Sequence, residues 1–210
     1  MSVITEQLGF DALLNATDAI NHSRKIERET AHLPNTMSEA LPFYRVLLKQ
    51  HHAAILVANV DEAMHLRKEA YNLARRLNGG KAGILANPSS PGNVLDRESA
   101  ASHDSVPLWG QSGSFVIDAA GVKVRVELEG IFGIGSSSLY WPGFSAHAVE
   151  FDKPFLSPTG YRSFLGVHAE PVPGITPDEF TRRIIEAYVT HELKRKLMPV
   201  EDKYRNRDRE

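Results

Sequence analysis

Histidine, glutamate and arginine side chains that could transfer protons or hold an anion lie between residues 147 and 170. His147 belongs to one predicted strand, and Arg162, His168 and Glu170 lie in the next strand or directly after it. Because alternate residues of a strand share a face, the last three are expected side by side, with His147 reaching them from the neighbouring strand. A histidine–carboxylate pair is what proton transfer or a metal site needs. The pattern predicts a hydrolase or lyase cleft, and the competing interpretation is that the histidines are hydrogen-bonded structural residues.

Aromatic and hydroxyl side chains near these residues suggest a ligand-binding surface. The stretch 157–164 combines hydroxyl groups, aromatic rings and an arginine, whose planar fork suits a carboxylate or phosphate. Aromatic residues beside glycines are typical of binding hot spots when they are exposed, and of the core when they are buried. The predicted ligand-binding residues are Arg162, Tyr161, Trp141, Ser157 and Trp109.

The sequence carries none of the strong catalytic motifs. It has no phosphate loop, zinc-binding HExxH helix, GxSxG nucleophile elbow or dinucleotide-binding GxGxxG after a strand. The run GIGSSS at 133–138 is interpreted as a strand end or bulge, with an anion cradle as the alternative. The absence of cysteine excludes disulfides, thiolate catalysis and cysteine-ligated zinc. No metal and no cofactor is predicted.

Two helices followed by a sheet must position these residues. Apolar residues recur at helical spacing from residue 43 to 58 and from 63 to 77, which predicts an antiparallel αα-hairpin that begins at Pro42 and ends at Gly79 and Gly80. Residues 81–114 are predicted to be mostly loop. Strict alternation over 122–129 predicts a strand with one solvated face, paired in a hairpin with the strand before it.

The predicted fold class is α+β, with an antiparallel sheet over about residues 114–170 packed by the hairpin and by a C-terminal helix. That helix is expected over 176–198, opened by a capping box at Thr176. The chain divides into an N-terminal helical segment (1–32), a single α+β domain (33–198) and a charged flexible tail (199–210). The N-terminal segment is compatible with a homodimer.

Charge and hydropathy narrow the class of partner. A formal net charge of −2 gives no basic surplus of the kind that duplex-binding domains show. No signal peptide and no apolar run of membrane-spanning length is visible, which favours the cytoplasm. A nucleic-acid-binding alternative would use the basic residues of the second helix and the C-terminal helix, which are Arg67, Lys68, Arg75, Arg76, Lys194, Arg195 and Lys196.

Several stretches resemble a bacterial protein family of unknown function. They are LPFYRVLLKQHHAA, LARRLNGGKAGIL, VPLWGQSG, WPGFSAHAVEFDKPFLSPTGYRSFLGVHAE and PGITPDEF, spread over roughly residues 33–198. The resemblance implies a proteobacterial origin, often on a plasmid or other mobile element, and it implies no activity. The density of aromatic residues and glycines without a recognisable catalytic constellation gives the leading hypothesis, a non-enzymatic binding protein of the bacterial cytoplasm with an unknown protein as its partner. The resemblance adds a plasmid or other mobile element as the context it serves.

Overall fold

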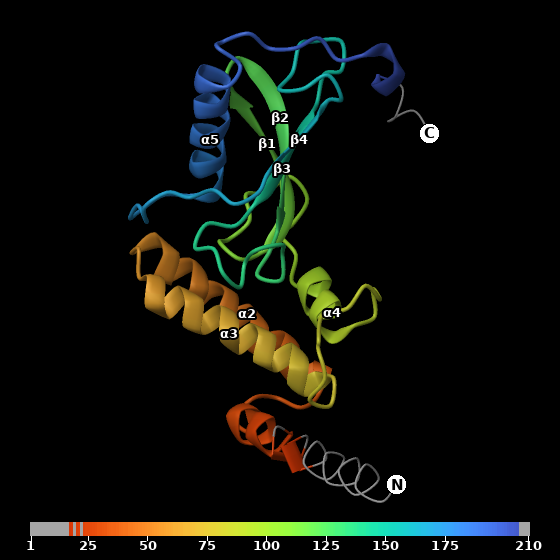
Figure 1. The fold of residues 1–210 in the computed structure, drawn as a ribbon, viewed down its shortest axis with the longest axis vertical. Helices are drawn as coiled ribbons and strands as arrows, with labels where there is room; N and C mark the ends of the chain where they lie inside the picture. The colour runs from red at the N-terminus through yellow and green to blue at the C-terminus, as the bar shows by residue number, and fades with distance from the viewer. Residues whose placement is uncertain (1–16, 19, 22, 206–210) are drawn as a thin grey trace, which may run out of the picture.

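The computed structural model describes residues 17–18, 20–21 and 23–205 and has the α+β class that the sequence predicts (Figure 1). Residues 23–30 are helical and precede the named elements. The helices are α2 (Met37–Leu56), α3 (Val60–Leu77), α4 (Pro91–Glu98) and α5 (Pro177–His191), with a 3-10 turn η1 (Asp202–Tyr204), and the strands are β1 (Ser112–Ala119), β2 (Val122–Glu129), β3 (Phe144–Ala148) and β4 (Tyr161–Phe164). No helix in the described ranges has the length and apolar character to cross a membrane.

The four strands form one antiparallel sheet in the order β1-β2-β3-β4. A two-residue turn joins β1 to β2, and both of its residues have positive φ, 51° at Ala120 and 80° at Gly121. This is the geometry of a type I′ turn, whose twist matches that of the flanking strands. The hairpin predicted between residues 122–129 and the strand before them is therefore confirmed, and its turn fixes the register in which Ala119 faces Val122.

One face of the sheet is covered by α5 (Figure 1). The β2 strand alternates buried valine and leucine with exposed lysine, arginine and glutamate, as its sequence pattern predicts. Phe180 and Ile185 of α5 are 3% and 0% exposed and share one hydrophobic core with Val124 and Val126. The exposed lysine, arginine and glutamate side chains of β2 lie on the opposite face of the sheet.

The αα-hairpin of α2 and α3 lies beyond one end of the sheet rather than across its face (Figure 1). Asn59 caps α3 by accepting a hydrogen bond from the Glu62 N–H at 3.2 Å. The hairpin meets the sheet through the segments that flank the strands. Arg67, only 2% exposed, donates to the carbonyl oxygens of Ser136, Leu139 and Tyr140 at 2.9, 2.5 and 2.7 Å.

Three element boundaries differ from the prediction in the helical regions. α2 begins at Met37, so Pro42 lies inside the helix and not in its first turn. A helix the sequence did not reveal, α4, occupies part of the predicted loop and buries Leu95 completely. α5 ends at His191, because the chain turns away through positive φ values at Lys194 and Arg195.

Two strand ends and the start of α5 also differ from what the sequence predicts. The sequence predicts these two strands over about 145–151 and 161–169, but β3 ends at Ala148 and β4 at Phe164, and Gly166 bends the chain with a φ of 68°. The Thr176 hydroxyl forms no cap to the backbone of α5 and instead hydrogen-bonds the Asp178 carboxylate at 2.6 Å. The predicted capping box is therefore wrong, although the helix begins where it was expected.

The two ends of the described chain pack against the body. His32 lies 2.7 Å from the Glu69 carboxylate of α3, and Ile26 is 8% exposed. Near the other end Val200 is 1% exposed, and the Glu201 N–H donates to Pro158 O at 2.9 Å. Residues 1–16 of the predicted N-terminal segment and 206–210 of the predicted tail lie outside the described residues, and the domain boundaries stay a prediction.

Candidate functional site: the open edge and open face of the sheet

His147 lies on the face of the sheet that α5 leaves uncovered. Its Nε2 is 3.2 Å from the Glu127 carboxylate and 3.1 Å from the Ser145 hydroxyl, and all three residues come from the paired strands β2 and β3. The Glu127 side chain is half exposed, at 50%. A solvent-screened pair of this kind contributes little to stability, so its value lies in the polar surface it creates.

Arg162 lies on the opposite face. In the β3–β4 register Ala146 faces Arg162 and His147 faces Tyr161, so Arg162 shares a face with the buried alanine. Its guanidinium stacks over the Tyr188 ring of α5, 4.7 Å from the centroid. His147 and Arg162 therefore cannot line one cleft.

His168 and Glu170 are exposed and lie beyond the end of β4, after the bend at Gly166. The predicted convergence of His147, His168, Glu170 and Arg162 is wrong. β4 ends before His168 and Glu170, and its register with β3 sets Arg162 and His147 on opposite faces of the sheet. Among residues 17–18, 20–21 and 23–205, no three histidine or acidic side chains are grouped as a metal ion would require.

The two tryptophans are core residues in the structure. Trp109 and Trp141 are 0% and 1% exposed, and Trp141 stacks on Phe180 with ring centroids 4.7 Å apart. The Trp109 indole N–H donates to Ile175 O at 2.8 Å, and that of Trp141 to Ala169 O at 3.0 Å. Both indoles thus tie the segment between β4 and α5 to the core, and a ligand cannot reach them in this conformation.

Ser157 and Tyr161 have different surroundings. The Ser157 hydroxyl donates to Tyr161 O at 2.6 Å and so closes its own turn. The Tyr161 ring is 47% exposed on the open face, where it meets the His147 ring edge-on at 5.0 Å. Of the predicted ligand-binding residues, Tyr161 is the one presented to solvent on this face.

A row of side chains crosses the open face from one edge of the sheet to the other. Cross-strand pairing sets Val116 beside Arg125, Arg125 beside His147 and His147 beside Tyr161. Val116 is 43% exposed and stands at the β1 edge. Sequence reasoning did not single out Val116 or Arg125, because the pairing that aligns them is a long-range property.

The outer edge of β1 has an unpaired stretch in its middle. In a two-residue hairpin the residues next to the turn exchange both main-chain hydrogen bonds, and hydrogen-bonded pairs then recur at every second residue. Residues 113, 115, 117 and 119 therefore bond to β2, and Ser112, Ser114, Val116 and Asp118 point their N–H and C=O groups outward. The signal for this parity, the turn at 119–121, was present in the sequence.

Each end of that edge is already occupied. Ser112 O accepts the Ala101 N–H at 2.8 Å, and Asp118 O accepts the Arg182 Nε–H of α5 at 3.3 Å. Between them, no residue of the described chain pairs with the outward main-chain groups of Ser114 and Val116. The open stretch is long enough for a short extended segment to add as a fifth strand.

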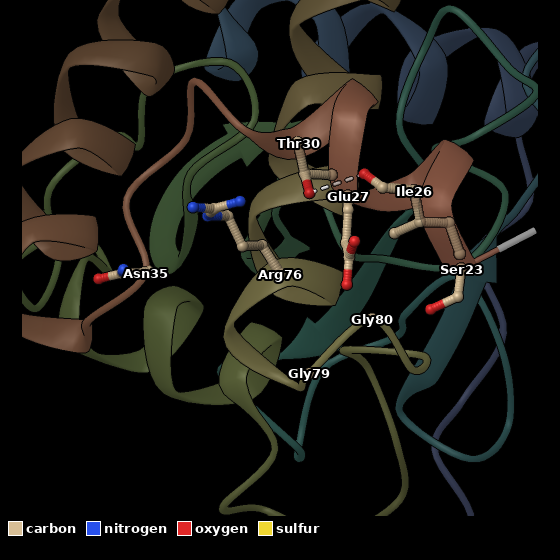
Figure 2. Close-up of a pocket in the computed structure, with 8 residues that line it drawn as sticks. All are labelled: Ser23, Ile26, Glu27, Thr30, Asn35, Arg76, Gly79 and Gly80. Carbon is tan, nitrogen blue, oxygen red and sulfur yellow. Dashed lines mark hydrogen bonds between the residues drawn. The ribbon is translucent and has the colours of Figure 1, made fainter. Parts of the chain in front are cut away.

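A separate pocket of about 260 Å³ lies between residues 23–35 and the end of α3. Figure 2 shows its lining, with Glu27 and Thr30 from the N-terminal side and Arg76 from α3. The Thr30 hydroxyl donates a hydrogen bond to Ile26 O at 2.8 Å. The Arg76 Nε is buried without a hydrogen-bond partner among the described residues.

These features define an α+β protein with a covered sheet face, an open polar face and one partly open strand edge. Two curated proteins of Escherichia coli, each called Protein KlcB, are similar to the chain. One is 40% identical over 134 residues, which are 63% of this chain and 31% of the relative, and the other is 36% identical over 113 residues, which are 53% and 23%. The chain thus spans less than a third of the length of either relative.

The similarity supports the expected bacterial relationship. No protein-family model matches the chain, and no solved structure matches it.

Proposed function

We propose that the protein is a non-enzymatic interaction protein of the bacterial cytoplasm, which binds an extended segment of a partner protein along β1. The observation that carries the proposal is the open stretch at Ser114 and Val116, bounded by occupied groups at Ser112 and Asp118. Strand addition to a sheet edge is a recurring mode of peptide recognition, in which main-chain hydrogen bonds supply affinity and alternate side chains supply specificity.

The main chain alone would give weak binding. The two residues offer four outward groups, and each hydrogen bond contributes about 1 kcal/mol net, so together they favour a complex by roughly 4 kcal/mol, which corresponds to millimolar affinity. Side chains must provide the rest. On the open face a partner strand would place its alternate residues beside Val116, which is 43% exposed, and within reach of Arg125. We therefore expect an apolar and an acidic residue at alternate positions of the partner segment.

The biological context is proposed from the resemblance and the relatives. The stretches shared with a bacterial family that is frequent on plasmids and other mobile elements favour a partner encoded by, or acting on, such an element. The relatives, both called Protein KlcB, are proteins of Escherichia coli and so support the bacterial part of this context alone.

Proline at position 116 tests the proposal, because the Val116 N–H points away from β2 and its loss removes no ladder hydrogen bond. Val116→Pro should block strand addition, whereas Val116→Thr keeps the N–H and the branched side chain. The full chain and both variants are used as bait in lysate of the native host, with a photo-crosslinker at position 114. We expect one protein that crosslinks to wild type and Val116→Thr and is lost with Val116→Pro.

Three results would contradict the proposal. They are a partner retained equally by Val116→Pro, the absence of any specific protein partner, and crosslinks only between two copies of this chain. Circular dichroism and thermal unfolding of the three baits show whether the proline variant is folded, and a destabilisation of about 1 kcal/mol is expected from its fixed φ. If Val116→Pro does not fold, acidic and bulky substitutions at Ser114 take its place in the same comparison, with the photo-crosslinker moved to position 116.

A further inference from the structure

We propose that a cavity on the solvent side of α3 binds a small phosphorylated molecule, with Asn72 at its base and Lys68 and Arg75 on either side. The cavity has a volume of about 460 Å³, and its lining residues are Met64, Arg67, Lys68, Tyr71, Asn72, Arg75 and Ser137. This volume lies within the range of small-molecule sites. The proposal is independent of the β1 edge, which lies on the other half of the molecule.

The helix brings the lining residues together by their spacing. Residues 64, 68, 71, 72 and 75 recur at three and four positions and so lie along one stripe of α3. Lys68 and Arg75 are two turns apart, which separates their Cα atoms by about 10 Å. Their long side chains can converge from both sides on an anion above Asn72.

Asn72 is the residue that distinguishes this cavity from an ordinary basic surface. It is 8% exposed, and within the described part of the chain its amide has no hydrogen-bond partner. The amide lines the cavity, where its N–H groups are free to donate to a bound ligand. Asn72 lines the cavity together with the Ser137 hydroxyl, which offers a second donor.

The charges around the cavity are of one sign. None of its lining residues is acidic, and no carboxylate of the described chain forms an ion pair with Lys68 or Arg75. Arg67, beneath them, is 2% exposed and contacts carbonyl oxygens and a histidine rather than a carboxylate. Its positive charge is thus enclosed without a counter-ion, which adds to the attraction for an anion.

The remaining walls suit an organic group rather than a bare ion. Met64 and Tyr71 flank the cations, and the Tyr71 hydroxyl is held by Ser136 at 3.0 Å, which fixes the ring. The Tyr71 ring also packs edge-on against Phe132 at 5.4 Å. A phosphate between the cations with an apolar or aromatic body against Met64 and Tyr71 would use every part of the lining.

Inorganic pyrophosphate and adenosine monophosphate serve as probes, titrated into the full-length protein at constant ionic strength and followed by amide NMR and isothermal calorimetry. We expect saturable binding that shifts the Asn72 side-chain amide resonances. Asn72→Leu and Lys68→Gln/Arg75→Gln should each weaken binding at least tenfold. Lys81→Gln, which removes an exposed cation outside the cavity, is the matched control and should leave the affinity unchanged.

Binding that is absent at 10 mM probe, or equal in all variants, would overturn the proposal. Binding of a DNA or RNA oligonucleotide that is far tighter than that of either probe, with a steep salt dependence, would also overturn it in favour of a nucleic-acid surface. Asn72→Leu tests the cavity without altering charge. The Lys68 and Arg75 side chains are not buried, so their replacement should leave the protein folded. The test therefore does not depend on the Asn72 substitution alone.

Discussion

The Arg67 Nε–H donates to His51 Nε2 at 2.9 Å, and both side chains are almost fully buried between the αα-hairpin and the segments that lead to the sheet. Because Nε2 accepts this bond, the proton of neutral His51 resides on Nδ1, which lies 2.8 Å from Trp109 O and donates to it. One arginine and one histidine thus connect α2 and α3 to the loop before β1 and the loop before β3.

Removal of Arg67 should therefore separate the hairpin from the sheet. Arg67→Gln leaves three carbonyl oxygens and the His51 Nε2 without donors, so we expect a loss of about 3 kcal/mol or more in the free energy of unfolding. Urea denaturation measures it. The control is Arg75→Gln on the same helix, which should change stability by no more than about 0.5 kcal/mol. Equal effects of the two variants would show that the Arg67 contacts are dispensable.

The buried His51 and the half-buried Asp96 make the free energy of unfolding change with pH in opposite directions between about pH 4 and 6.5. Burial, aided by the charge of Arg67, lowers the pKa of His51 from 6.5 to about 4, so the unfolded chain takes up a proton that the folded chain does not, and stability rises with pH in this window. Burial raises the pKa of Asp96 from 3.8 to about 6, so the folded chain keeps a proton that the unfolded chain loses, and stability falls with rising pH. In the wild type the two slopes oppose each other.

Asp96→Asn should expose the histidine contribution. The variant lacks the Asp96 contribution, which makes stability fall as the pH rises. Its free energy of unfolding should therefore rise more steeply with pH than that of wild type, by up to about 1.4 kcal/mol per pH unit between pH 4 and 6. Urea unfolding at half-unit steps of pH measures the difference. Parallel curves for the two proteins would contradict the raised pKa of Asp96.

Gly83 allows the segment before α4 to lie directly against α3. A Cβ at this position would lie 2.1 Å from the carbonyl carbon of Ala74, which is backbone and cannot give way. Gly83→Ala should therefore cost several kcal/mol or prevent folding. Gly121→Ala is the contrast, because its Cβ meets nothing within 4 Å and the cost comes only from a φ of 80°, about 1 kcal/mol. Thermal unfolding that ranks the two variants in the reverse order would refute the close packing of the Gly83 segment on α3.

Local patterns were enough to predict much of the fold. The alternation in β2 and its pairing in a hairpin with β1 depend on neighbours in sequence, and both were expected from the residues themselves. α4 was missed because Pro91 and Gly92 read as loop, whereas its stability comes from the complete burial of Leu95 against other elements.

The candidate site was harder to predict, because it depends on pairing between distant strands. Alternation along β4 sets Arg162 and Phe164 on one face, but whether His147 lies on that face or the other depends on the β3–β4 register, which a single strand's sequence does not show. The tryptophans show the same limit, since burial distinguishes a core residue from a ligand-binding one and residue type does not.

Amide hydrogen exchange of the isolated protein, resolved by residue, tests the open edge most directly. The account predicts that the amides of Phe115 and Ile117, which bond to β2, are protected, while those of Ser114 and Val116 exchange rapidly and become protected when the partner segment is added. Protection of Ser114 and Val116 equal to that of their neighbours in the free protein would show that the edge of β1 is already paired, and would contradict the proposed mode of binding.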